Sequence, residues 1–317
     1  MKLIPHFRGN PLFQPKSELP IIGFARLAMM MSAAVIVVSL IAWSTLGLNY
    51  GVDFKGGSMI EVQAKSGQAD IAGLRSVVGG LGLGDVQIQQ FGKPSDVLIR
   101  IEQQPGGEKA QQAALGKVLE AIGSSYEQRR AEVVGPAVSG ELRTTGMIAV
   151  LCSILAIILY VWFRFEWQFA VGAVVALTHD VLITIGVFSL LQLEFDLSTV
   201  AALLTILGYS VNDTVVVSDR IRENLRKFKK LEITSLLNRS INETLARTLM
   251  TSLTTLTVLV ALYILGGEVI RNFTFAMMFG VIIGTYSSIF IAAPLLAYLG
   301  VKRDWSGVTR GAPAAAN

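Results

Sequence analysis

Six stretches of the sequence are apolar over the length that a helix needs to cross a bilayer, which is about 20 residues. They lie at 27–48, 146–163, 167–191, 197–217, 248–267 and 273–300. A chain in the hydrocarbon core must satisfy its backbone polar groups internally, so we predict that these stretches are transmembrane helices. The first is predicted to be an uncleaved anchor, because its apolar run is too long for a signal peptide and no cleavage site follows.

The composition excludes several other classes of protein. Apolar residues make up 52% of the chain and charged residues 16%, whereas soluble domains carry about 25% charged residues. These values exclude a disordered chain, which needs low hydrophobicity and high charge, and they argue against a soluble enzyme. With one Cys and two His, the chain has no intramolecular disulfide, and we expect neither a metal nor a cofactor.

Basic residues predict how the chain is oriented. Clusters of Lys and Arg occupy 1–26, 218–246 and 301–317, whereas the two short loops that are predicted on the opposite side carry Glu194, Asp196, Glu268 and Arg271. Because Lys and Arg are enriched in cytoplasmic loops, we predict that both tails and the 218–246 loop are cytoplasmic. Topology then accounts for the net charge of +4, so no nucleic-acid partner is expected, and the cluster 226–230 is suited to contact anionic lipid.

The segment 49–143, between the first two spans, is long enough to form a separate domain. Strands are predicted over 58–65, 85–91, 96–102 and 126–134, and helices over 69–81 and 107–122. The order βαββαβ is that of a ferredoxin-like fold, which the topology places outside the cytoplasm. The glycines of 79–84 follow a helix rather than a strand, so a dinucleotide-binding fingerprint is rejected.

Asp213 is an acid inside the predicted fourth span, where it follows Asn212. On insertion scales an acid at a helix centre costs about 2.5–3.5 kcal/mol, and it is retained where it has a partner, water or a function. One interpretation of Asp213 is a structural acid that pairs with a base or lies near water. The other interpretation is a proton carrier.

Other polar residues in the spans extend this hypothesis. Arg247, at the start of the fifth span, is either the ion-pair partner of Asp213 or a basic residue that reaches the membrane surface. Thr251 and Thr255 follow Arg247 on one helical face. Asp180 lies in the middle of the third span, beside His179. The candidate proton pathway therefore consists of Asp213, Arg247, Asn212, Thr251, Thr255 and Asp180.

Glycine motifs mark two further positions. The sequence Gly-Val-Asp-Phe-Lys-Gly-Gly directly follows the first span, and we interpret it either as a turn or as a hinge that passes movement of the spans to the domain. Its candidate residues are Gly51, Asp53, Lys55, Gly56 and Gly57. In the sixth span, Gly280 and Gly284 predict close helix packing, and Pro294 predicts a kink.

Several motifs together resemble those of the SecD/SecF family of protein-export membrane proteins, which is related to the resistance-nodulation-division transporters. They are the 51–57 motif, Val-Gly-Pro at 134–136, Gly-Tyr-Ser-Val-Asn-Asp-Thr at 208–214, and Asn-Arg-Ser-Ile-Asn-Glu-Thr at 238–244 with the following 247–252. The resemblance implies an accessory subunit of the bacterial Sec translocase in the inner membrane, not an enzyme. It implies SecD, the SecYEG channel, YajC and the translocating preprotein as partners.

The family resemblance also implies that the proton-motive force assists late steps of preprotein export, with Asp213 and Arg247 at proton-path positions. The sequence has no nucleotide-binding Gly-x-x-x-x-Gly-Lys motif, so the energy is expected from an ion gradient or a partner. Alternative interpretations are a proton-coupled efflux transporter, a scaffold without ion flow, and an aspartyl protease that uses Asp180 and Asp213. The coupling ion, H⁺ or Na⁺, stays open.

Overall fold

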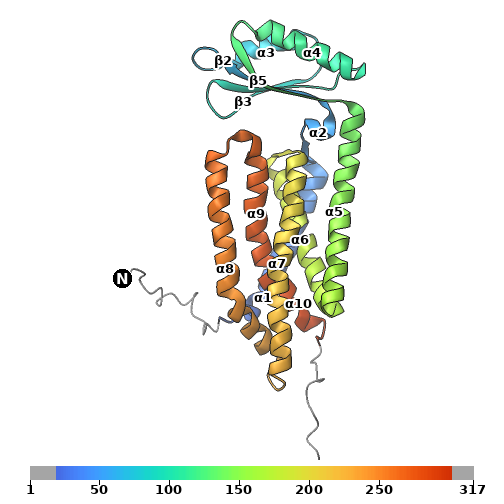
Figure 1. Cartoon of the computed structure of the whole chain (residues 1–317), viewed down its shortest axis with the longest axis vertical. Helices are drawn as coiled ribbons and strands as arrows, with labels where there is room; N and C mark the ends of the chain where they lie inside the picture. The colour runs from blue at the N-terminus through green and yellow to red at the C-terminus, as the bar shows by residue number, and fades with distance from the viewer. Residues whose placement is uncertain (1–18, 302–317) are drawn as a thin grey trace, which may run out of the picture.

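A computed structural model describes residues 19–301, so most of the predicted tails 1–26 and 301–317 lie outside the described residues. Within this range, six helices are long and apolar enough to cross a membrane, and a small α+β domain joins the first to the second (Figure 1). The predicted fold class is confirmed. The membrane-length helices are α1 Ile21–Leu46, α5 Pro136–Arg164, α6 Trp167–Leu191, α7 Leu197–Lys227, α8 Ile233–Leu265, and a sixth that comprises α9 Arg271–Ser287, η3 Ser288–Ala292 and α10 Ala293–Tyr298.

The α+β domain is a four-stranded antiparallel sheet with two helices on one face. The strands lie in the order β3-β4-β2-β5, and the elements are β2 Gly57–Ala64, α3 Ile71–Gly79, β3 Val86–Gln90, β4 Asp96–Ile101, α4 Gly107–Ile122 and β5 Tyr126–Val134. Alternate residues such as Ile60, Val97 and Ile99 are fully buried against Val78 of α3 and Val118 of α4. The other face of the sheet is turned toward the helical bundle (Figure 1).

Short elements connect the domain to the bundle. They are β1 Asn49–Tyr50, α2 Val52–Lys55, β6 Glu194–Phe195 and the 3₁₀ turn η2 Glu268–Ile270. Strands β1 and β6 pair in parallel, although about 140 residues separate them in the sequence. This pairing fixes the start of the α+β domain against the loop between α6 and α7.

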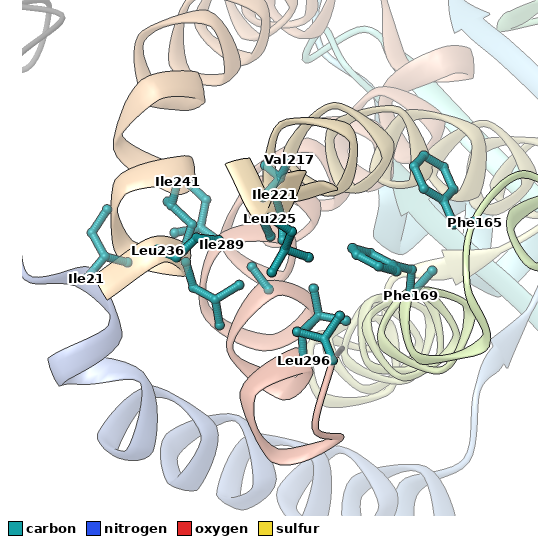
Figure 2. Close-up of a cluster of buried hydrophobic side chains, with 14 of the residues drawn as sticks. Ile21, Phe165, Phe169, Val217, Ile221, Leu225, Leu236, Ile241, Ile289 and Leu296 are labelled. Carbon is teal, nitrogen blue, oxygen red and sulfur yellow. The ribbon is translucent and has the colours of Figure 1, made fainter. Parts of the chain in front are cut away.

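Several helices begin before the predicted spans do, and the predicted loop over 218–246 is mostly helical. Helix α7 continues to Lys227 and α8 begins at Ile233. Each extension presents apolar residues at helical spacing, including Ile221, Leu236 and Ile241, to a buried cluster at the end of the bundle farthest from the α+β domain (Figure 2). We call this end the distal end. Basic residues on the exposed faces lower the average hydropathy of the segment, which is why the sequence pattern suggested a loop.

The sixth membrane-length helix contains a close helix contact and a break. A Cβ atom at Gly280 would lie 2.3 Å from Cγ1 of Ile206, and a Cβ atom at Gly284 would lie 3.0 Å from Cβ of Ser210. The backbones of α7 and α9 can approach so closely because these glycines have no side chain. The π-helical segment η3 precedes Pro294, which has no N–H to continue the regular hydrogen-bond ladder.

We expect Gly280→Ala to lower the stability of the bundle. The added methyl group would overlap Ile206, and overpacking of this kind costs about 1–3 kcal/mol. Thermal unfolding in detergent should show a lower midpoint for this variant. Gly140→Ala is the matched control, because nothing lies within 4 Å of a Cβ atom there and alanine favours a helix. Equal midpoints for the two variants would contradict the close contact between α7 and α9.

Candidate functional site

The junction motif occupies the connection between α1 and the sheet. The N–H of Gly51 donates to the carbonyl of Phe195 at 2.9 Å. Gly56 and Gly57 have φ angles of 74° and 115°, and a Cβ atom on Gly57 would lie 2.5 Å from the carbonyl oxygen of Ile101. These positions therefore need glycine for the turn into β2, while Lys55 is exposed.

Asp53 connects this junction to the first turn of α7. Its Oδ2 accepts a hydrogen bond from the N–H of Leu197 at 2.9 Å. Asp196, the N-cap of α7, accepts from the N–H of Thr199 at 2.7 Å. Two carboxylates thus satisfy N–H groups at the positive end of the dipole of α7. The helix that carries Asp213 is therefore bound at its start by a residue of the junction motif.

A second contact joins the α+β domain to the same loop. Arg100 of β4 forms an ion pair with Glu194 of β6, and the side chain of Asn272 donates to the carbonyl of Glu194 at 3.2 Å. Burial raises the pKa of Glu194 above its ordinary value of 4.5, although Arg100 opposes the rise. The pair borders a cleft of about 460 Å³ between the open face of the sheet and the bundle. Sequence reasoning missed this pair, because only the tertiary fold brings the two residues together.

Asp213 is buried in the bundle, with 2% of its surface exposed. Its Oδ2 has no hydrogen-bond partner among the described residues. Arg247 of α8 attracts the carboxylate electrostatically, but within residues 19–301 no ion pair of 4.0 Å or less joins the two. Arg247 itself is exposed on the surface of the bundle. An unpartnered buried carboxylate oxygen costs about 1–3 kcal/mol or more, so Asp213 is poorly explained as a purely structural acid.

The other predicted pathway residues on α7 and α8 lie toward the surface. Asn212 and Thr251 are exposed, and Thr255 is half-buried. Thr255 accepts a hydrogen bond from the hydroxyl of Tyr209 at 3.4 Å, which joins α8 to α7. Thr251 donates to the backbone carbonyl of Thr248. The structure therefore places these hydroxyls at the edge of the α7–α8 contact rather than around Asp213.

Asp180 is fully buried, and both oxygens of its carboxylate have hydrogen-bond partners. Its Oδ2 accepts hydrogen bonds from the hydroxyls of Ser210 at 2.6 Å and Ser287 at 2.9 Å. Its Oδ1 lies 2.9 Å from Nδ1 of His179. The carboxylate therefore joins α6, α7 and α9, and Ser210 lies one helical turn before Asp213 on α7. The sequence analysis did not identify Ser210 or Ser287 as partners of Asp180.

The motif at 238–244 has a structural role at the distal end. The side-chain oxygens of Asn242 and Asn238 accept hydrogen bonds from the N–H groups of Leu19 and Ile22, at 3.0 and 3.3 Å. Two amides of α8 thus cap the start of α1, where Ile21 also packs into the distal cluster. Among the described residues, no group of three or more His, Cys, Asp or Glu side chains is arranged to hold a metal ion.

We expect Asp53→Ala to loosen the first turn of α7. Loss of a carboxylate that caps a helix N-terminus costs about 0.5–2 kcal/mol. Hydrogen exchange at the amides of 197–199 should be faster in Asp53→Ala than in the unsubstituted chain. Asp53→Asn keeps an acceptor oxygen and should exchange nearly as slowly. Equal exchange in all three proteins would show that the Asp53–Leu197 bond does not hold this turn.

The raised pKa of Glu194, which lies between α6 and α7 outside the membrane-spanning segments, predicts a pH dependence of stability. Above pH 4.5 the unfolded chain ionises this carboxyl before the folded chain does, so its contribution to stability falls as pH rises through the folded pKa. Glu194→Gln cannot titrate and should lack this part of the pH dependence. Thermal unfolding measured at several pH values above 4.5 tests this, and parallel profiles for the two proteins would refute it.

Comparisons with known proteins agree with the family resemblance. Residues 114–302 match the family described as "Protein export membrane protein SecD/SecF, C-terminal", and residues 41–68 match the "SecD/SecF GG Motif". The chain is 48% identical to the protein translocase subunit SecF of Cereibacter sphaeroides, with 86% of each chain covered. It is 45% identical to the protein translocase subunit SecF of Vibrio alginolyticus, with 92% of this chain and 94% of the relative covered.

Longer relatives match this chain over part of their length. It is 42% identical to the protein translocase subunit SecDF of Brucella abortus, with 95% of this chain but 39% of the relative covered. The crystal structure of SecDF from Thermus thermophilus, described as a translocon-associated membrane protein, matches with a TM-score of 0.79 at 38% identity and covers 88% of this chain. This chain spans 38% of that SecDF chain. The chain is a multi-pass membrane protein that belongs to the SecD/SecF family of protein export membrane proteins.

Proposed function

We propose that this chain works with SecD in the Sec translocase and uses the proton-motive force to assist late, extracytoplasmic steps of preprotein export. The observation that carries the proposal is that one helix has both features that coupling needs. Near its middle, α7 holds the buried, incompletely bonded Asp213. At its start, α7 is bound by Asp53 of the junction that leads into the α+β domain.

Protonation of Asp213 would change the balance of forces between α7 and its neighbours. The ionised carboxylate is attracted by Arg247 of α8, and a neutral carboxyl would lose most of this attraction. One charge that crosses a membrane potential is worth about 2.3 kcal/mol per 100 mV, several times RT. A free energy of this size is sufficient to bias α7 between two positions.

The junction supplies a route from α7 to the α+β domain. A shift of α7 would act on Asp53 through the Leu197 hydrogen bond and on β1 through its pairing with β6. The Arg100–Glu194 pair supplies a second link, directly to the sheet. In this mechanism the 51–57 motif is a hinge. A shift of α7 would break the hydrogen bond between Ser210 and Asp180, while Asp180 of α6 stays bonded to Ser287 of α9.

The proposed orientation places both termini and the α7–α8 turn in the cytoplasm and the α+β domain in the periplasm of a bacterial inner membrane. It is supported by the basic residues of 218–246, most of which flank the α7–α8 turn at the distal end. The relatives that fuse SecD and SecF in one chain support association with SecD. SecYEG, YajC, the preprotein and membrane lipid are the other proposed partners. The family of the chain favours export over small-molecule efflux.

We expect Asp213→Asn to slow conversion of a secretory precursor to its mature form several-fold in cells with matched expression, because the variant cannot take up or release the proton. Pulse labelling measures this rate. Asp219→Asn is the control: Asp219 is also on α7, but its side chain is 61% exposed and pairs with Arg164 at 3.4 Å. Unchanged export with Asp213→Asn, or equal loss with Asp219→Asn, would refute a proton-carrying role for Asp213.

A further inference from the structure

Three buried side-chain oxygens lie without hydrogen-bond partners in neighbouring parts of α7 and α8. They are Oδ2 of Asp213 and the hydroxyls of Thr214 and Thr248, and at most 3% of the surface of each residue is exposed. Two hydrogen bonds define the antiparallel register of these helices, Tyr209 with Thr255 and Asn224 with Ser240. Between these two levels, the turn of α7 that carries Asp213 and Thr214 lies opposite the turn of α8 that contains Thr248.

Neighbouring hydroxyls on the buried face of α8 do have hydrogen-bond partners. Ser240 donates to the carbonyl of Leu236, and Thr244 donates to the carbonyls of Ser240 and Ile241. Ser252 bonds to Thr285 of α9. A threonine in a helix can normally donate to the carbonyl four residues before it. Thr214 and Thr248 do not, although a buried polar group without a partner is unfavourable.

We propose that Thr214 and Thr248 complete the proton site of Asp213 by binding the water molecule that carries the proton to and from it. This inference rests on the proposed function and names residues that the sequence hypothesis did not include. A water molecule that accepts a hydrogen bond from one hydroxyl and donates one to the other keeps its second hydrogen for Oδ2 of Asp213. On loading, a proton leaves a hydronium ion and forms an O–H bond with Oδ2 of Asp213, and a water molecule remains between the hydroxyls. Release reverses this step.

The charges around the site favour a proton over a sodium ion. A carboxylate and two hydroxyls are oxygen ligands that a hard cation also accepts. However, Arg247 of α8 acts electrostatically on Asp213. Its positive charge opposes a sodium ion that stays bound beside the carboxylate, whereas a proton that has bonded to Oδ2 leaves a neutral carboxyl and a neutral water molecule. Of the other titratable groups nearby, Asp180 is bonded to His179 and Ser210. Tyr286 of α9 stacks on His179, whose Nε2 has no hydrogen-bond partner among the described residues.

The experiment compares three threonines that differ in their bonding. The full chain and its SecD partner are reconstituted in liposomes, a potassium diffusion potential drives proton entry, and an enclosed pH-sensitive dye reports the flux. Thr248→Val and Thr214→Val keep the side-chain shape but remove the hydroxyl, and each should lower the proton flux several-fold. Thr248→Ser should restore it. Thr244→Val is the matched control on the same face of α8, and its flux should equal that of the unsubstituted chain.

Each contrary outcome has a distinct meaning. Full flux in Thr248→Val and Thr214→Val, with flux lost in Asp213→Asn, would overturn the hydroxyl site and leave the proposed function intact. Full flux in Asp213→Asn would overturn both. An equal loss in Thr244→Val and Thr248→Val would assign the effect to packing and overturn the site. Flux of labelled sodium in place of protons would overturn the choice of ion. Yield and gel-filtration profiles that match the unsubstituted chain confirm that each variant is folded.

Discussion

The arrangement of the bundle depends on one constraint, which is that a polar group in the hydrocarbon core of a membrane has to find its partner within the protein. Backbone groups meet this constraint by forming helices. The side chains of Asp180, Ser210 and Ser287 meet it by bonding across α6, α7 and α9. Asp213 meets it incompletely, because one of its oxygens has no partner among the described residues. Asp180 of α6 is bonded by Ser210, and Asp213 follows Ser210 by one helical turn on α7. This contrast between a bonded and an unbonded carboxylate is the reason for proposing that Asp213 carries the proton.

The α+β domain is attached at the start of α7, the helix that carries Asp213. The domain is connected to the bundle by α1 and α5, yet its specific contacts are with the loop that starts α7. Asp53 bonds the first turn, β1 pairs with β6, and Arg100 pairs with Glu194. Arg100 is on β4 and the Asp53 junction leads into β2, and these are the two inner strands of the sheet. A movement of α7 along its axis would therefore act on the middle of the sheet.

Much of this structure could be predicted from the sequence, because apolar periodicity is a local property. The six spans and the βαββαβ order followed from residue spacing alone. Which face of each helix is buried could not be predicted in this way. On α8, the stripe of Arg247, Thr251 and Thr255 and the adjacent stripe of Ser240, Thr244, Thr248 and Ser252 have equivalent spacing. Packing of Leu236, Leu237 and Ile241 in the distal cluster buries the second stripe. The Arg100–Glu194 pair could likewise not be predicted, because its two residues lie far apart in the sequence.

The asparagine caps on α1 have a consequence for the order in which the chain is assembled. Leu19 and Ile22 donate to residues that are more than 200 positions later in the sequence, and Tyr286 of α9 bonds to Ser32 and Ala28 of α1. During synthesis α1 is made before α8 and α9, so the side chains that fix its start and its middle do not yet exist when it forms. Although α1 precedes the other helices of the bundle in the sequence, it is among the last of them to be fixed in place.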